Sequence, residues 1–276
     1  MDIDNLVVVS DLHIGCALGL CHPDGANRDE GGKYMPSGFQ LKLWSFWMSF
    51  WNDFVPASTK GEPYAVVING DALDGVHHGS TTQWSHNLTD QGKAARDIIA
   101  PLSTACDGRL YMIRGTEAHV GQSGQDEERL AMDVGAIPNK TGQRARYDLW
   151  KLIGPRLVHF THHIGTTGSQ HYESTAVHRE LMESFLEAGR WNRRPPDVII
   201  RGHRHRYIET GIPTANGEAR AVVTPGWQGK TPFAWKVAGA RQSEPQFGGV
   251  LIRWSEDNQE LFVRSKVWSL EREEPE

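Results

Sequence analysis

Short, largely apolar runs that end abruptly in polar residues recur along the chain. Five of them are rich in β-branched residues and are bounded like buried parallel strands; they cover residues 6–9, 65–68, 110–113, 157–160 and 198–200. Each run is followed closely by Asp, His or Gly. Because ligands of open α/β sheets lie beyond the carboxyl ends of the strands, we expect these polar residues to share one functional edge.

Helical periodicity fills the segments between these strands. Residues 39–54 place Phe at spacings of three and four with Trp on an adjoining face, which predicts a core helix that is apolar over most of its circumference. Further helices are expected over residues 88–105, 125–134 and 173–189. Alternating segments interrupted by Gly and Pro then predict antiparallel strands, at residues 206–212, 219–224, 249–254 and 260–268. This order favours a mixed α/β sheet core with helices outside.

Length and composition narrow the class of protein. The 276 residues can bury roughly three quarters of their extended surface, and we find no long linker, so a single domain over residues 1–276 is expected. A hydrophobic content of 38% excludes global disorder, and a net charge of −5 excludes a polybasic nucleic-acid-binding role. The N-terminus has no signal or membrane-spanning pattern, and the three cysteines form no CxxC pair. We therefore predict a cytoplasmic protein with no membrane association and no obligate protein partner.

Metal-binding residue types gather at four of the predicted strand ends. They are Asp11 and His13, the segment Gly70-Asp71-Ala72-Leu73-Asp74, His162-His163, and Gly202-His203-Arg204-His205. Most Asp and His residues are ordinary surface residues, but that explanation requires four independent coincidences. Two carboxylates with three or four imidazoles are too many for one closed metal site. They suit a dinuclear centre in which a hydroxide bridging two cations is the nucleophile.

Taken together, the motifs DLH (11–13), GDALD (70–74), HH (162–163) and GHRH (202–205) resemble those of the calcineurin-like metallophosphoesterases, in that family's order. The resemblance implies a four-layer α-β-β-α sandwich of the metallophosphoesterase type, with the metals at the carboxyl edges of the strands. It implies that Asp71 bridges two cations and that Asp74 supports the ligands. It also implies which residues bind each cation. The first is bound by Asp11, His13 and His205, and the second by His162 and His203.

One segment departs from the family pattern. The usual Gly-Asn-His motif, in which Asn binds the second metal and His assists the reaction, is replaced by Gly115-Thr116-Glu117-Ala118-His119. We assign Glu117 as the substitute metal ligand, with Thr116 as the alternative. His119 is assigned a catalytic role, although it could instead replace the missing ligand. If none of these residues binds metal, the second site is broken.

Two further choices concern neighbouring side chains. His162 and His163 should point in opposite directions on a strand edge, and the resemblance favours His162 as the ligand. Arg114, His78 and Arg204 lie near motif ends, and we predict that they bind the substrate phosphate. The alternative for each of them is an ordinary solvated role.

The resemblance implies a metal-dependent phosphoric ester hydrolase. We predict a phosphodiesterase that acts on a nucleotide or a nucleic-acid end and uses two divalent cations, with Mn²⁺ expected first and Fe, Zn²⁺ or Ni²⁺ as alternatives. A phosphomonoesterase is the second hypothesis. Its protein-phosphatase form is disfavoured because Gly75-Val76, not Arg-Gly, follows Asp74. A non-catalytic scaffold of the same fold is the third, and metal content distinguishes it from the enzymes.

Overall fold

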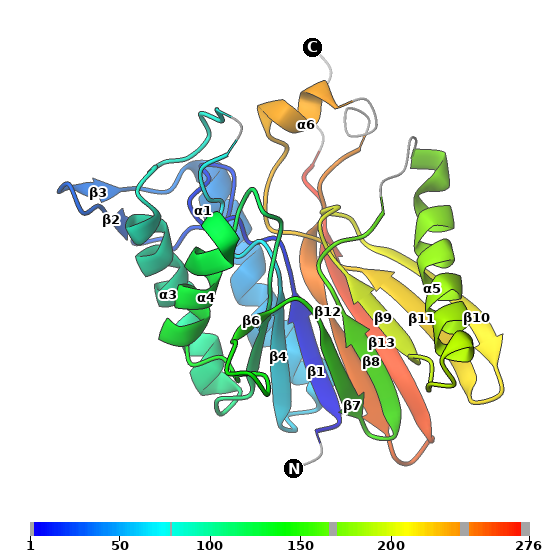
Figure 1. Ribbon diagram of the computed structural model, residues 1–276. Coiled ribbons are helices and arrows are strands. Elements are labelled where there is room, and N and C mark those ends of the chain that lie inside the picture. The colour runs from blue at the N-terminus through cyan, green and yellow to red at the C-terminus, as the bar shows by residue number, and fades with distance from the viewer. Residues whose placement is uncertain (1–2, 78, 166–169, 238–242, 272–276) are drawn as a thin grey trace.

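Two β-sheets packed face to face form the centre of the molecule. The computed structural model describes residues 3–77, 79–165, 170–237 and 243–271. The first sheet has the strand order β13-β12-β1-β4-β5-β6 and the second β10-β11-β9-β8-β7. Helices cover the outer face of each sheet (Figure 1), which gives the four α-β-β-α layers that the resemblance implies.

The first sheet combines a parallel half with an antiparallel half. Strands β1 (Asn5–Val9), β4 (Tyr64–Asn69), β5 (Leu110–Ile113) and β6 (Ala145–Arg146) run parallel. Strands β12 (Phe247–Ser255) and β13 (Glu260–Trp268) form an antiparallel pair beside β1. Val9 is in register with Ile68, so the residues that follow β1 and β4 leave the sheet side by side.

In the second sheet, the parallel strands lie in the middle. They are β8 (Arg156–Phe160), β9 (Val198–Arg201) and β11 (Gly217–Val223). The antiparallel strands β7 (Leu149–Ile153) and β10 (Ile208–Thr214) form its edges. A small hairpin of β2 (Ala26–Asn27) and β3 (Lys33–Tyr34) stands apart from both sheets.

The helices divide between the two outer faces. One face carries α1 (Gly38–Ser49), η1 (Phe50–Phe54), α2 (Val55–Thr59), α3 (Leu88–Ala105) and α4 (Gln125–Asp133). The other carries α5 (Glu173–Arg190), and the short α6 (Pro232–Lys236) stands above the strand ends. Single turns η2 (Gln122–Gly124) and η3 (Gln170–Tyr172) precede α4 and α5. No helix in the described part of the chain is long and apolar enough to cross a bilayer.

Three apolar clusters separate the four layers. The alternation of side chains along each strand explains the division: Val8 and Val67 face the second sheet with Phe160, whereas Val7 and Val66 face the first helical layer. A third cluster joins the second sheet to α5.

The five parallel strands and four helices predicted from the sequence are present, except that the helix expected over residues 39–54 changes to a π-helical turn at η1.

Candidate metal centre

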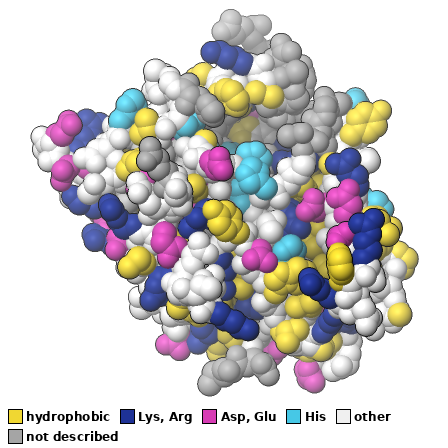
Figure 2. Space-filling view, viewed as in Figure 1, with side chains coloured by type: hydrophobic (Ala, Val, Ile, Leu, Met, Phe, Trp, Pro, Cys, Tyr) yellow, Lys and Arg dark blue, Asp and Glu magenta, His cyan; other side chains and the backbone are white. Residues whose placement is uncertain are grey.

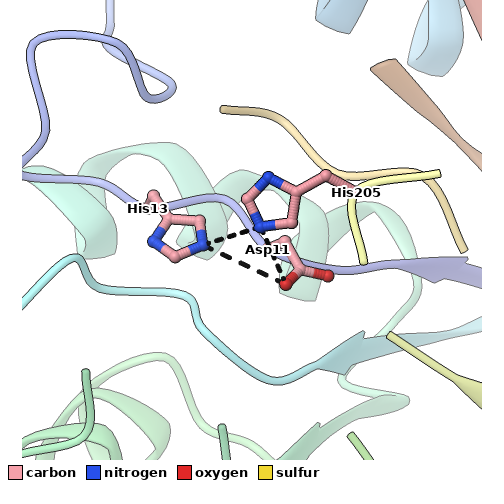
Figure 3. A group of neighbouring side chains, drawn as sticks. All are labelled: Asp11, His13 and His205. Carbon is pink, nitrogen blue, oxygen red and sulfur yellow. Dashed lines mark hydrogen bonds and ion pairs between the residues drawn. The ribbon is translucent and has the colours of Figure 1, made fainter. Parts of the chain in front are cut away.

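Six Asp and His side chains gather where β1, β4, β8 and β9 end. They form two groups whose ligand atoms lie within 4.8 Å of one another, Asp11 with His13 and His205, and Asp71 with His162 and His203. Figure 3 shows the first group, in which His205 Nε2 lies 3.2 Å from His13 Nε2 and 3.3 Å from Asp11 Oδ1. Histidine side chains are visible near the middle of the molecular face in Figure 2.

The two groups are in contact with each other. His162 Nε2 lies 3.0 Å from Asp71 Oδ2 and 3.8 Å from Asp11 Oδ1. This brings a carboxylate of each group to the same imidazole. The structure thus brings together all six residues for which the resemblance implies direct ligation of the two cations.

The backbone at the centre is conformationally unusual. Five of the six residues have φ between 45° and 72°, the left-handed region that non-glycine residues rarely adopt; they are Asp11, His13, Asp71, His203 and His205. Such conformations cost on the order of 1–3 kcal/mol each and persist where surrounding structure enforces them, often at functional sites. They point successive side chains into one crevice instead of onto opposite faces of a continued strand.

Glycines in the motifs allow the side chains to approach closely. A Cβ on Gly70 would lie 2.3 Å from His162 Nδ1, and a Cβ on Gly115 would lie 2.1 Å from Asp71 Oδ1. Both distances are far below van der Waals contact. Position 70 therefore has to be glycine to make room for the His162 side chain, and position 115 has to be glycine to make room for the Asp71 side chain.

The hydrogen bonds of Asp11 leave one of its oxygens free for a cation. Ser10 Oγ donates to Asp11 Oδ2 at 2.5 Å, and the backbone N–H of His203 donates to the same oxygen at 3.1 Å. Asp11 Oδ1 is buried and accepts no hydrogen bond within the described structure. The partners of this oxygen are imidazole nitrogens, His205 Nε2 at 3.3 Å and His162 Nε2 at 3.8 Å. Carboxylate oxygen and imidazole nitrogen together form a donor set that fits a divalent cation.

The imidazoles are oriented by their opposite ring nitrogens. His162 Nδ1 donates to Asn69 O at 2.6 Å, and His13 Nδ1 donates to Asp74 Oδ1 at 3.1 Å. Each bond directs Nε2 at the cluster, as in metal sites where a second hydrogen bond orients the ring. Gln228 Nε2 also donates to Asp74 Oδ1 at 3.1 Å. Asp74 forms a further group of potential ligand atoms with His13 and His119, so its supporting role stays a prediction.

The carboxylates and imidazoles of the two groups shift one another's pKa values. Burial alone would raise the pKa values of Asp11 and Asp71, but the neighbouring imidazoles, His162 foremost, hold both well below the usual range. Burial likewise disfavours the charged form of His162, yet Asp71 and Asp11 raise its pKa to about 10. The metal-free protein therefore holds a proton on His162 where a cation would bind, so proton and cation compete.

In the segment that departs from the family pattern, Thr116 and Glu117 lie in different surroundings. The Thr116 N–H donates to Asp71 Oδ1 at 2.7 Å and its hydroxyl lies 3.2 Å from the same oxygen. Glu117 is exposed and belongs to neither group of ligand atoms. Of the two predicted oxygen donors, Thr116 is thus the one at the second group, and metal binding by Glu117 stays a prediction.

His119 lies beside the first group. Its Nδ1 donates to Asp74 O at 2.5 Å, and its ring meets that of His13 edge-on with centroids 4.6 Å apart. Burial and the neighbouring His13 lower the pKa of His119 to about 4. At neutral pH the imidazole of His119 is therefore neutral. Its proton is on Nδ1, so its Nε2 carries a lone pair, and Nε2 gains a proton only when the ring becomes an imidazolium. His119 belongs to the group of potential ligand atoms with His13 and Asp74 and not to the group with Asp71, so both of its predicted roles stay predictions.

The remaining predicted residues lie in different surroundings. His163 is exposed while His162 is buried. Arg204 donates to the backbone oxygens of Gly165 and Glu173, which directs it toward α5. Arg114 is buried at the end of β5, and His78 lies outside the described residues. Phosphate binding by these cations stays a prediction.

Glu127 is a residue that the sequence reasoning missed. Its side chain is fully buried, and its two oxygens accept the N–H groups of Ala72 at 3.2 Å and Gly115 at 2.8 Å. It thus links the loop that carries Asp71 to the loop that carries Thr116. Burial, then the charge of Asp71, raises its pKa to about 7. The sequence did carry one signal for its burial. Glu127 lies three and four positions before the apolar Leu130 and Ala131, which places all three on the same buried face of the helix.

The fold and the site together define an α-β-β-α protein with two adjoining Asp/His groups that could hold metal ions. No family model matches the chain, and no curated protein matches it. Among solved structures, Vps29 of Entamoeba histolytica complexed with Zn²⁺ is 12% identical over 96% of this chain and 98% of that one, with a TM-score of 0.42. A predicted phosphoesterase of Streptococcus pneumoniae is 11% identical over 98% and 99%, with a TM-score of 0.36. The sulfate thiohydrolase SoxB of Thermus thermophilus is 11% identical over 98% and 57%, with a TM-score of 0.41.

Proposed function

We propose that the protein is a metal-dependent phosphodiesterase that hydrolyses a phosphodiester of a nucleotide or of a nucleic-acid end. The observation that carries the proposal is the buried Asp11 Oδ1, which accepts no backbone or hydroxyl hydrogen bond and lies 3.3 Å from His205 Nε2 and 3.8 Å from His162 Nε2, one imidazole of each ligand group. A scaffold with no metal function has no need of a buried carboxylate oxygen whose partners are imidazoles, because such an oxygen is costly to bury unless it is paired. Mn²⁺ remains the cation expected first, and the cytoplasm the expected compartment.

The residues divide naturally between two cations. Asp11, His13 and His205 would hold the first, and His162 and His203 the second, with Asp71 between them and Thr116 Oγ1 beside it. When bound, two divalent cations would polarise the phosphoryl oxygens and acidify a coordinated water.

The chain's own groups orient and protect this chemistry. Asp74 keeps His13 in the tautomer that presents Nε2, and Ser10 fixes the carboxylate plane of Asp11. His119 presents Nε2 next to the first group because its Nδ1 is held by Asp74 O. There it can take or return a proton at the attacking or leaving oxygen, a role that usually contributes roughly 10²–10⁴-fold in rate.

Space next to the centre favours a diester. A cavity of about 950 Å³ lies between the loops that follow Asp74 and Thr116. None of the six ligands lines it, but His77 of its wall packs against His119 with ring centroids 4.4 Å apart, so a second ester group would reach it past His119. A monoester would leave this volume without substrate. The phosphomonoesterase remains the second candidate because the ligand set alone serves both reactions.

A metal-titrated assay separates the candidates. Purified protein is stripped with chelator, reloaded with Mn²⁺, Zn²⁺, Fe²⁺ or Ni²⁺, and assayed with bis(4-nitrophenyl) phosphate and 4-nitrophenyl phosphate, with Asp11→Asn as the control. We expect metal-dependent turnover of the diester that Asp11→Asn abolishes. Monoester turnover tenfold faster at matched metal would favour the second candidate, and a protein that binds no metal would be a scaffold.

A further inference from the structure

The cavity beside the metal centre ends at an exposed aromatic ring. Its walls come from the segment after Asp74, from the segment around Thr116 and from the turn before α4, and Tyr147 closes one side. Tyr147 directly follows β6, which is parallel to β5. The ring therefore stands at the same carboxyl edge as the metal ligands, two strand spacings or about 10 Å along the edge from the end of β4.

Arg114 holds this ring in place. The Arg114 guanidinium lies over the Tyr147 ring at 4.8 Å from its centroid, and Arg114 Nη1 donates to the Tyr147 hydroxyl at 3.2 Å. The same Nη1 is 3.2 Å from Ser123 O, so the arginine is itself anchored. A ring that is 68% exposed yet fixed by a buried cation is a preformed surface for stacking.

The charge of the cavity disfavours a second phosphate as its ligand. Arg114 is the one lysine or arginine among the described lining residues, His77 is the one histidine, and Glu117 and Asp126 contribute two carboxylates. Arg114 Nη2 also lies 3.7 Å from Glu128, which offsets its charge further. Apolar side chains line the cavity as well, including Val76 and Val120. These walls suit a flat, uncharged group with polar edges.

We propose that this cavity binds the nucleobase of the substrate, which stacks on Tyr147 while its phosphate lies at the metal centre. The inference rests on the proposed phosphodiesterase function and names the group that the enzyme recognises beside the phosphate. Base–aromatic stacking tolerates any base because every base has a π-face. Selection for a nucleoside therefore comes from Tyr147, and selection for the phosphate from the metal centre.

The test compares two ligands that differ only in the base. Binding of adenosine 5′-monophosphate and of ribose 5-phosphate to the Mn²⁺-loaded protein is measured by calorimetry for the wild type, Tyr147→Ala, Tyr147→Phe and Tyr172→Ala. Tyr172 is a matched control because its side chain is 63% exposed and does not line the cavity. We expect Tyr147→Ala to weaken the nucleotide about 5- to 150-fold, the effect of losing one base stack, and to leave ribose 5-phosphate unchanged. Tyr147→Phe should retain most of the affinity, and Tyr172→Ala all of it.

Several results would overturn the proposal. A wild-type protein that binds the nucleotide no more tightly than ribose 5-phosphate has no base site, and equal losses for both ligands in Tyr147→Ala would mean a general disturbance. Because these are equilibrium measurements, they do not depend on turnover. Failure of the phosphodiesterase function would appear separately, as absent hydrolysis or as phosphate binding that does not require metal.

Discussion

Glu127 is expected to set both the stability of the metal-free protein and its affinity for the second cation. Replacing it with Gln keeps its shape but removes its charge and one of its two acceptor oxygens. The backbone N–H of Ala72 or of Gly115, 3.2 and 2.8 Å from the carboxylate, then faces an amide NH₂ instead of an oxygen. The two loops that carry Asp71 and Thr116 lose part of the link between them.

The sign of the stability change depends on pH. Because the folded pKa of Glu127 is about 7 against an ordinary value of 4.5, this side chain stabilises the fold most below pH 4.5. That contribution is lost as pH rises through 7, by about 3 kcal/mol at 1.36 kcal/mol per unit. Near pH 5 the folded side chain is a neutral acid, so Gln loses only a hydrogen bond to a neutral acceptor, which is worth roughly 0.5–1.5 kcal/mol. Glu127→Gln should therefore be close to neutral near pH 5 and stabilising by about 2 kcal/mol near pH 8, where the wild type must bury a carboxylate.

Urea unfolding in the presence of chelator measures this difference at pH 5 and pH 8. Glu128→Gln is the matched control, because Glu128 is on the same helix and its two oxygens also accept backbone N–H groups, those of Arg144 at 2.9 Å and Ala145 at 2.8 Å, which belong to the β6 side. Calorimetric Mn²⁺ titration supplies the second readout. We expect Glu127→Gln to weaken the second cation about 10- to 100-fold, as for other residues that orient ligands, and Glu128→Gln to leave it unchanged.

Two outcomes would refute this reasoning. If the stability difference between Glu127→Gln and wild type is the same at both pH values, Glu127 does not carry the raised pKa that its burial implies. If the two variants alter cation affinity equally, the link between the two ligand loops has no specific role.

Three further results are expected at the centre. Asp71→Asn should lower metal content as well as rate, because a neutral amide cannot hold two dications; a stoichiometry of two cations per chain in the variant would show that Asp71 is not the bridge. His119→Ala should cost roughly 10²–10⁴-fold in rate with metal content unchanged, and loss of metal from this variant would instead make His119 a ligand. Since the pKa of His162 is about 10 in the metal-free protein, cation binding should release a proton and tighten about tenfold per pH unit between pH 6 and 9; an affinity independent of pH in calorimetry would contradict the pairing of His162 with Asp71.

The parallel strands were predictable because each is a run of apolar residues whose two faces are both buried. Strand β6 was not, since it consists only of Ala145 and Arg146 and exists through its pairing with β5. Strand β7 was also missed, because Leu149 and Ile153 are buried while the residues between them are exposed or half-buried. Such a short edge strand has too few apolar positions to be separated from a loop.

The candidate site was predictable where its residues follow strands, and was not where contacts form between distant segments. Asp11, Asp71 and His162 each come after an apolar run, so topology alone brings them to one edge. Gln228 reaches Asp74 from a segment 154 positions away, and nothing in its local sequence marks it. Glu127 had a weak helical signal, but its partners are backbone N–H groups whose position depends on the folded loops.

The left-handed residues explain why these long-range contacts matter. Five conformations at roughly 1–3 kcal/mol each together cost about as much as the whole net stability of a typical domain, so they cannot be maintained by local preference. The backbone is instead held from outside: Asp11 N donates to Gly70 O and His13 N to Asp71 O, both at 3.0 Å, and Trp227 N donates to Asp11 O at 2.8 Å. Strain at one loop is therefore sustained by hydrogen bonds to another. Consequently, the positions of the side chains in the two Asp/His groups depend on each other in the metal-free protein.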